Sequence, residues 1–90
     1  MILSNSNIIQ LLKNKDQQAI TVIIEQYGDI LYGIIYRKVQ SEVLARIVMK
    51  RTFVMIWQQA ATYEETNERL FNWLVRIAHQ AMSGHLQKAA

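Results

Sequence analysis

The segment from Ser41 to Ala78 constrains the fold of this chain most, because it joins two strongly apolar stretches through a polar connector. The first stretch carries Phe53 and Trp57, and the second carries the pattern Phe71-x-Trp73-Leu74-x-x-Ile77-Ala78. Apolar residues at three- and four-residue steps are typical of helices that pack against neighbours. The chain contains no proline, and the connector contains no glycine, which favours long uninterrupted helices. The sequence therefore predicts two packed helices in this segment.

Two further helices are predicted ahead of Ser41. Ser4 is a good capping residue for a short apolar helix that ends near Lys13. From Asp16 to about Lys38, apolar residues again recur at helical spacing, which predicts a second, longer helix.

The second of these helices leaves two local questions. The many β-branched residues between Ile20 and Ile35 are compatible with a strand, but helical spacing over more than twenty residues outweighs that propensity. Gly28 and Asp29 predict a break or kink inside the helix.

The third helix is expected from Ser41 to about Ala61, and the fourth from about Asn67 to Gln87. The third is apolar on every side, which is typical of a central helix contacted from several directions. The fourth has one broad apolar face and one polar face. We therefore expect an all-α domain over residues 1–90, in which four or five helices pack around the third. The side chains expected to be buried together are Phe53, Trp57, Leu70, Trp73, Leu74 and Ile77.

Composition restricts the class of protein. Hydrophobic residues make up 51% of the 90 residues, which is enough for the dense core that a small domain needs. The absence of cysteine excludes a disulfide framework. No apolar run approaches the roughly 20 residues that span a bilayer, and no basic region precedes an apolar one at the N-terminus. A cytoplasmic protein without membrane contact is expected.

No catalytic or metal site is recognisable. His79 and His85 are six residues apart and so do not adjoin on a helix, as metal ligands usually do. Glu64 and Glu65 have no histidine or third acid in register for acid–base chemistry. We expect no enzyme activity, no metal and no cofactor.

The order, spacing and types of these residues resemble region two of the extracytoplasmic-function group of bacterial RNA polymerase sigma factors. The resemblance extends to the opening helices, where Leu11-Leu12, Asp16, Ala19, Tyr27 and Leu31-Tyr32 match in type. It implies a domain of transcription initiation that binds RNA polymerase core and the upstream, minus-ten element of the promoter. The family's promoter-distal helix-turn-helix domain is absent after Ala90, and we expect either a piece of a longer factor or a naturally short protein.

The resemblance implies a partner surface on the third helix. Family members carry an exposed acidic stripe there, which docks on a helical clamp of the polymerase core. In this chain the apolar frame is kept, but the charges are reversed, which opposes the usual docking. The partner-binding residues predicted here are Arg46, Ile47, Lys50, Arg51 and Val54. The plainer interpretation is that the cations only solvate an exposed edge. However, an exposed apolar strip beside charged residues on a central helix contacts a partner protein more often than it contacts only water.

The resemblance also implies a DNA surface. In the family, the connector that matches Gln58–Arg69 holds a flipped promoter base, and the last helix presents polar side chains to the same element. The predicted DNA-binding residues are Tyr63, Arg69, Asn72, Arg76, His79 and Gln80. We expect weak binding, because few cations are available to neutralise phosphates and Glu64 and Glu65 lie nearby. Tyr63 as an ordinary surface residue of the connector is the alternative.

Three functions remain open from the sequence. The first is a sigma-factor region-two domain in transcription initiation. The second is a protein-interaction module that kept the fold without promoter opening, and that binds a regulatory protein or a second copy through Ile47 and Val54. The third, a generic helical DNA-binding domain, is the weakest, because no tight helix-turn-helix with a basic recognition helix is present.

Overall fold

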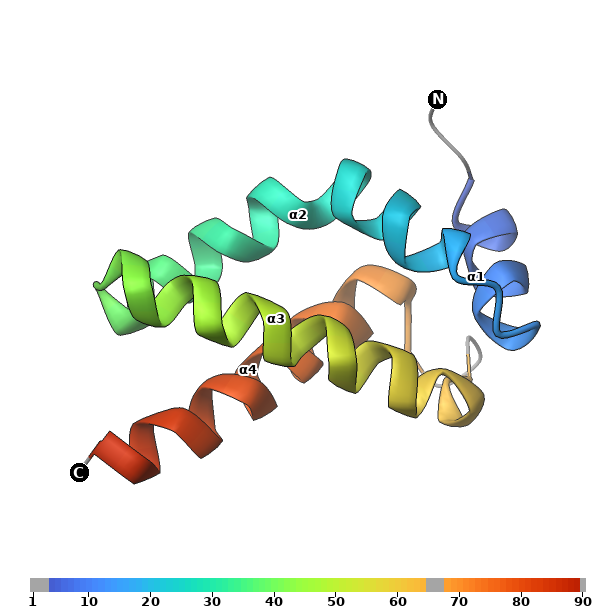
Figure 1. Ribbon diagram of the computed structural model, residues 1–90. Helices are drawn as coiled ribbons and strands as arrows, with labels where there is room; N and C mark the ends of the chain where they lie inside the picture. Colours follow the sequence, from blue (N-terminus) through green and yellow to red (C-terminus); the bar gives the residue numbers. More distant parts are fainter. Residues whose placement is uncertain (1–3, 65–67, 90) are drawn as a thin grey trace.

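The computed structural model describes residues 4–64 and 68–89 of the chain, with side chains described up to Ser83. Its elements, in order, are α1 (Asn5–Lys13), α2 (Gln18–Val39), α3 (Glu42–Gln59), the short 3-10 helix η1 (Ala60–Thr62) and α4 (Leu70–Ala89). In Figure 1, α2 and α3 form an antiparallel pair, α4 begins behind α3 and emerges below it, and α1 lies at one end of the molecule. α4 packs against both α2 and α3, while α1 packs against α2 and η1. The described residues contain no strand, so the all-α prediction is confirmed.

Capping residues fix the helix starts, as the sequence predicted. The Ser4 hydroxyl accepts the backbone N–H of Asn7 at 3.2 Å, and the Ser41 hydroxyl accepts that of Leu44 at 3.2 Å. Each bond satisfies one of the N–H groups that the first turn of a helix leaves without a partner. α2 ends where Gln40 turns into the left-handed conformation with φ 50°. The direction change from α2 to α3 is therefore set by local chemistry.

The predicted break at Gly28 and Asp29 is wrong. α2 runs through both residues without interruption. A glycine inside a helix costs about 1 kcal/mol relative to alanine, which is small compared with the packing of this helix. Ile23 and Leu31, on either side of Gly28, are both fully buried. Tertiary packing of α2 therefore outweighs the tendency of Gly28 to interrupt a helix.

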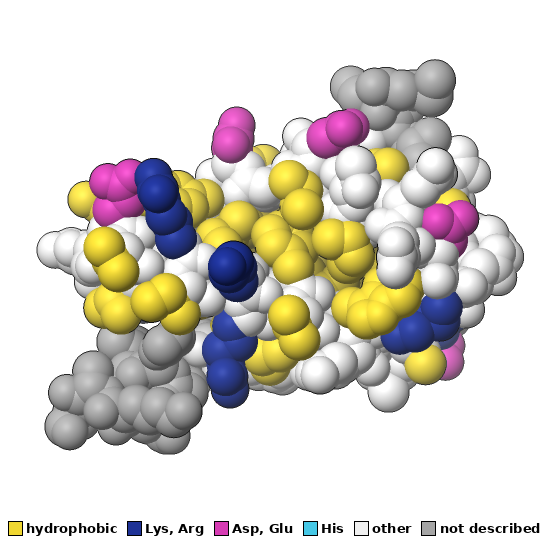
Figure 2. Space-filling model, in the orientation of Figure 1, with side chains coloured by type: hydrophobic (Ala, Val, Ile, Leu, Met, Phe, Trp, Pro, Cys, Tyr) yellow, Lys and Arg dark blue, Asp and Glu magenta, His cyan; other side chains and the backbone are white. Residues whose placement is uncertain are grey.

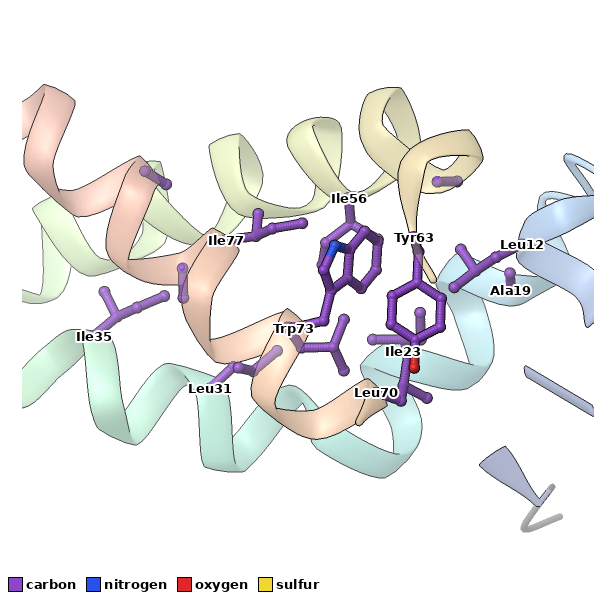
Figure 3. Close-up of a cluster of buried hydrophobic side chains, with 14 of the residues drawn as sticks. Leu12, Ala19, Ile23, Leu31, Ile35, Ile56, Tyr63, Leu70, Trp73 and Ile77 are labelled. Atoms are coloured by element: carbon purple, nitrogen blue, oxygen red, sulfur yellow. The ribbon is translucent and has the colours of Figure 1, made fainter. Parts of the chain in front are cut away.

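The core is built around Trp73 of α4. Figure 3 shows its indole pointing toward Ile56 of α3 and lying beside the ring of Tyr63. The two ring centroids are 4.8 Å apart, with the planes tilted by 49°. The predicted burial of α4 is confirmed, since the residues of its apolar face are at most 1% exposed: Leu70, Trp73, Leu74 and Ile77.

The predicted full burial of Phe53 and Trp57 is not observed, because both are partly exposed, although Phe53 packs against the core. The buried positions of α3 are instead Ala45, Val48, Thr52 and Ile56, at helical spacing. Phe53 and Trp57 follow Thr52 and Ile56 by one residue, which rotates them by about 100° to the border of the buried face. Since α3 is apolar all round, its sequence did not indicate which face is turned inward.

Candidate functional site

The polar face of α4 gathers most of the predicted DNA-binding residues on one side of the molecule. The exposed members of this face are Arg69, just before the helix, and Asn72, Arg76, His79 and Gln80 within it. Their three- and four-residue spacing places them on adjacent turns of one side, while the apolar face of the same helix is buried. Their predicted exposure is confirmed.

Arg76 is held by an acid of the connector. Its Nε and Nη2 donate to Oε1 of Glu68 at 3.0 and 2.5 Å, and Nε also lies 3.4 Å from Oε2. The hydrogen bonds that Arg76 donates to Glu68 raise the pKa of its guanidinium; desolvation opposes this rise, and the negative charge of Glu68 adds to it. One of the two arginines of the polar face is therefore neutralised by the chain itself.

Tyr63 is not exposed, so the prediction of a surface tyrosine in the connector is wrong. Its side chain is 1% exposed and packs on Trp73. Its hydroxyl donates to the backbone carbonyl of Glu68 at 3.0 Å. In this conformation the ring offers no face on which a base could stack. Tyr63 instead ties the start of the connector to its end.

Two residues outside the predicted set border the polar face. The side-chain amide of Gln59, at the end of α3, donates to the Gln80 oxygen at 3.4 Å. Lys38, near the end of α2, lines a small hollow of about 190 Å³ together with His79, Met82 and Ser83. Lys38 therefore adds a cation that lies far from α4 in the sequence. The basic residues in the last turn of α2 were the only sequence signal for it.

Two lysines at the end of α1, Lys13 in its last turn and Lys15 just beyond it, hold the start of the connector. Lys13 Nζ donates to the Tyr63 carbonyl and lies 4.0 Å from Oε1 of Glu64. Lys15 Nζ donates to the Trp57 carbonyl at 2.7 Å and lies 4.3 Å from the centroid of its ring. Cations near the last carbonyls of a helix satisfy them and interact favourably with the helix dipole. Neither contact was predictable from the sequence, because each spans more than forty residues.

The outer face of α3 is apolar and cationic, as predicted. Ile47 and Val54 are 44% and 54% exposed, and Val43 is 69% exposed. Lys50 and Arg51 are exposed between them. Figure 2 shows hydrophobic side chains across the middle of this side of the molecule, with Lys and Arg side chains beside them.

Arg46 differs from the other two cations of this face. Its guanidinium donates to the Glu42 carboxylate at 2.7 Å, one turn earlier on the helix. Both side chains are largely exposed, so the pair contributes little to stability. It does, however, offset the charge of Arg46 within the helix.

An open groove continues the apolar surface between α2 and α3. It has a volume of about 510 Å³ and is lined by Gln17, Ile20, Thr21, Phe53, Val54, Trp57 and Gln58. Phe53 and Trp57 therefore contribute to an outer surface, and Phe53 also packs against the core from its other side. Val54 belongs both to the groove and to the outer face of α3.

The described residues offer no metal site and no membrane span. Within residues 4–64 and 68–89, no group of three acidic or histidine side chains is placed to hold a metal ion. No described helix is long and apolar enough to cross a membrane.

Comparisons with known proteins give one match. The model of a family described as Sigma-70 region 2 matches residues 23–90, which is more than half of the chain. The match begins inside α2 and includes α3, the connector and α4. No curated protein and no solved structure matches.

Proposed function

Because this chain belongs to the sigma-70 region 2 family, we propose that it acts in transcription initiation by binding RNA polymerase core and the minus-ten element of the promoter. The family consists of non-enzymatic transcription-factor domains. The observation that carries the proposal is the exposed polar face of α4, with Arg69 and Arg76 beside the connector. This face and the connector coincide with the part of the chain for which the resemblance implies promoter contacts. We place the activity in the cytoplasm, where such a polymerase works.

Promoter binding through this face is expected to be weak and sensitive to salt. Arg69 is available to a phosphate, whereas Arg76 is bound to Glu68. Lys38 adds a further cation beside His79. Each phosphate that is neutralised contributes to affinity through the release of counterions, so a face with few free cations binds weakly. Asn72 and Gln80 offer hydrogen-bonding groups that contribute to base recognition only once the backbone is held.

We infer that the contact with the polymerase core lies on the outer face of α3. Ile47 and Val54 supply apolar area there, and Lys50 and Arg51 supply charge. The resemblance implies acids near these positions, so the electrostatic contribution has the opposite sign in this chain. We therefore propose that core binding depends mainly on the apolar residues of this face.

Binding to the host's own core polymerase tests the proposal most directly. The full chain should co-purify with core, and the complex should bind a single-stranded minus-ten oligonucleotide more tightly than the chain alone. A Val54→Asp change should weaken the complex, because it places a charge in the apolar strip. A chain that binds neither core nor the oligonucleotide, while folded by circular dichroism, would contradict the proposal.

The second candidate is a sigma-fold interaction module that binds a regulatory protein or a second copy without opening the promoter. The exposure of Ile47 and Val54, with the cations Lys50 and Arg51 between them along α3, favours this alternative. Permanganate footprinting of a promoter in the presence of core separates the two candidates. Reactive thymines in the minus-ten element indicate promoter opening, and their absence despite core binding indicates the interaction module.

A further inference from the structure

The outer face of α3 has the spacing of a helix-docking seam. Val43, Ile47, Lys50, Val54 and Trp57 follow one another at alternating steps of four and three residues. This spacing presents one continuous line of side chains to a neighbouring helix, as in a coiled coil. From Val43 to Trp57 the line is about 21 Å long, at 1.5 Å per residue. A partner helix of about four turns would cover it.

Unpaired positive charge lies in the middle of this seam. Lys50 is one of its members, and Arg51 lies directly beside it. Among the described residues, neither takes part in an ion pair, whereas Arg46 is paired with Glu42. The described acids of α2, Glu25 and Asp29, are exposed and form no ion pair with this seam. A partner that covers the apolar residues must therefore accommodate two cations.

A second copy of the chain is a poor partner. Lys50 lies midway between Val43 and Trp57, so a two-fold axis at the centre of the seam would bring each Lys50 against its own copy. A parallel arrangement in register would do the same. Like charges in close contact oppose association. Moving the two copies out of register would avoid this, but would leave part of the apolar seam uncovered.

The groove beside the seam provides a place for an apolar anchor. It is formed where Phe53, Val54 and Trp57 face Ile20 of α2, and its volume is about 510 Å³. A groove of this kind takes the large apolar side chain of a docked helix, and such anchors dominate the affinity of many interfaces. The cations lie on the same helix, within two turns of the groove.

We propose that the outer face of α3 binds an amphipathic helix of another protein whose apolar residues follow the seam and whose flanking residues are acidic. This inference rests on the proposed function in one respect, because it takes the same face of α3 as a protein-binding surface. Beyond the proposed function, this inference specifies which side chains the partner helix presents. Carboxylates on the flanks pair with Lys50 and Arg51, and a leucine or phenylalanine enters the groove next to Trp57.

A pair of synthetic helical peptides tests the proposal. The first, of about 18 residues to cover the seam with a turn to spare, carries leucine at alternating three- and four-residue steps and glutamate on both flanks. The control peptide has lysine in place of every glutamate. Binding of each labelled peptide to the full chain is measured by fluorescence anisotropy, at a concentration where the peptide alone is monomeric. The glutamate peptide should bind about tenfold more tightly than the lysine peptide, and added salt should reduce the difference.

A charge-reversed variant distinguishes this surface from the rest of the chain. Lys50→Glu with Arg51→Glu changes two exposed residues, so the fold should be retained, which circular dichroism checks. The variant should prefer the lysine peptide. Equal binding of both peptides, an unchanged preference in the variant, or a dimer of the parent chain that excludes the peptide would overturn the proposal.

Core binding, measured in parallel, keeps the two proposals apart. A chain that binds core but shows no preference for the glutamate peptide contradicts only the acidic partner. A chain that prefers the glutamate peptide but does not bind core contradicts only the polymerase contact.

Discussion

The guanidinium of Arg76 donates hydrogen bonds from Nε and Nη2 to the same carboxylate oxygen of Glu68, at 3.0 and 2.5 Å. Glu68 precedes α4, and Arg76 lies on its second turn, so the pair connects the end of the connector to the polar face. A phosphate that approaches Arg76 must displace this carboxylate. Within the proposed DNA surface, Glu68 therefore competes with DNA phosphates for Arg76.

Removing the charge of Glu68 should strengthen DNA binding. In Glu68→Gln, Arg76 loses a charged partner and becomes available, so affinity for a single-stranded minus-ten oligonucleotide should rise about two- to fivefold at low salt. Fluorescence anisotropy measures the change. Glu25→Gln removes the same charge from the exposed surface of α2 and serves as the control. An equal gain in both variants would assign the effect to net charge alone.

Removing both arginines of the polar face should abolish most of the binding. In Arg69→Ala with Arg76→Ala, the slope of log affinity against log salt should fall by about 0.7 for each lost phosphate contact. Lys50→Ala with Arg51→Ala removes the same charge from α3 and should leave both affinity and slope close to those of the parent. If the two double variants lose affinity equally, the polar face of α4 is not the DNA surface.

The two tryptophans should differ sharply in their contribution to stability. Trp73 is 1% exposed, and Trp73→Ala should cost about 3–5 kcal/mol, as for other large core truncations. Trp57 is partly exposed, and Trp57→Ala should cost clearly less. Urea unfolding followed by circular dichroism compares them. A complete loss of folding in Trp73→Ala agrees with this ranking, whereas equal unfolding midpoints contradict it.

The hydroxyl of Tyr63 should matter for stability and not for DNA. Tyr63→Phe removes its hydrogen bond to the Glu68 carbonyl and should cost about 0.5–1.5 kcal/mol. Tyr36→Phe, at a site that is 44% exposed, should have little effect on urea unfolding. Affinity for the oligonucleotide should be unchanged in Tyr63→Phe, since the ring is buried. A large loss of DNA binding without loss of stability would show that Tyr63 leaves the core when it binds.

Acids on α3 should restore the family's electrostatics. We expect Arg46→Glu with Arg51→Glu to bind more tightly than the parent to a core polymerase whose own sigma factors carry acids at these positions. Arg46→Gln with Arg51→Gln removes the cations without adding acids and should give an intermediate affinity. Co-sedimentation with core orders the three proteins. A parent that binds most tightly of the three would show that the cations themselves contact the polymerase.

The sequence predicted the helices well, because their signals are local. Ser4 and Ser41 mark helix starts through bonds to residues three positions away. The apolar face of α4 is evident from its periodicity alone. The break at Gly28 was wrong because a local preference was set against packing that involves distant residues.

The sites were harder to predict, for reasons that lie in tertiary structure. Tyr63 was assigned to the surface because the resemblance implies a base-holding connector there, but its ring packs on Trp73 of the following helix. Lys13 and Lys15 gave no signal, since their partners are the carbonyls of Tyr63 and Trp57. Every residue has a backbone carbonyl, so residue type does not indicate which carbonyl accepts a hydrogen bond. Contacts of this kind are therefore visible only in the structure.

The two lysines also show that the packed core and its polar contacts extend beyond the segment by which the family is recognised. The family match begins at residue 23, yet Ile8, Leu12 and Ala19 are fully buried ahead of it. A fragment cut at the start of the match would lose these apolar contacts, together with the cations that hold the Trp57 and Tyr63 carbonyls. The segment that carries the likeness to the family therefore contains only part of the contacts that stabilise this fold. A substitution of Lys13 or Lys15 would remove a hydrogen bond to the carbonyl of Tyr63 or Trp57. Such a substitution would therefore affect the connector although it lies outside the matched segment.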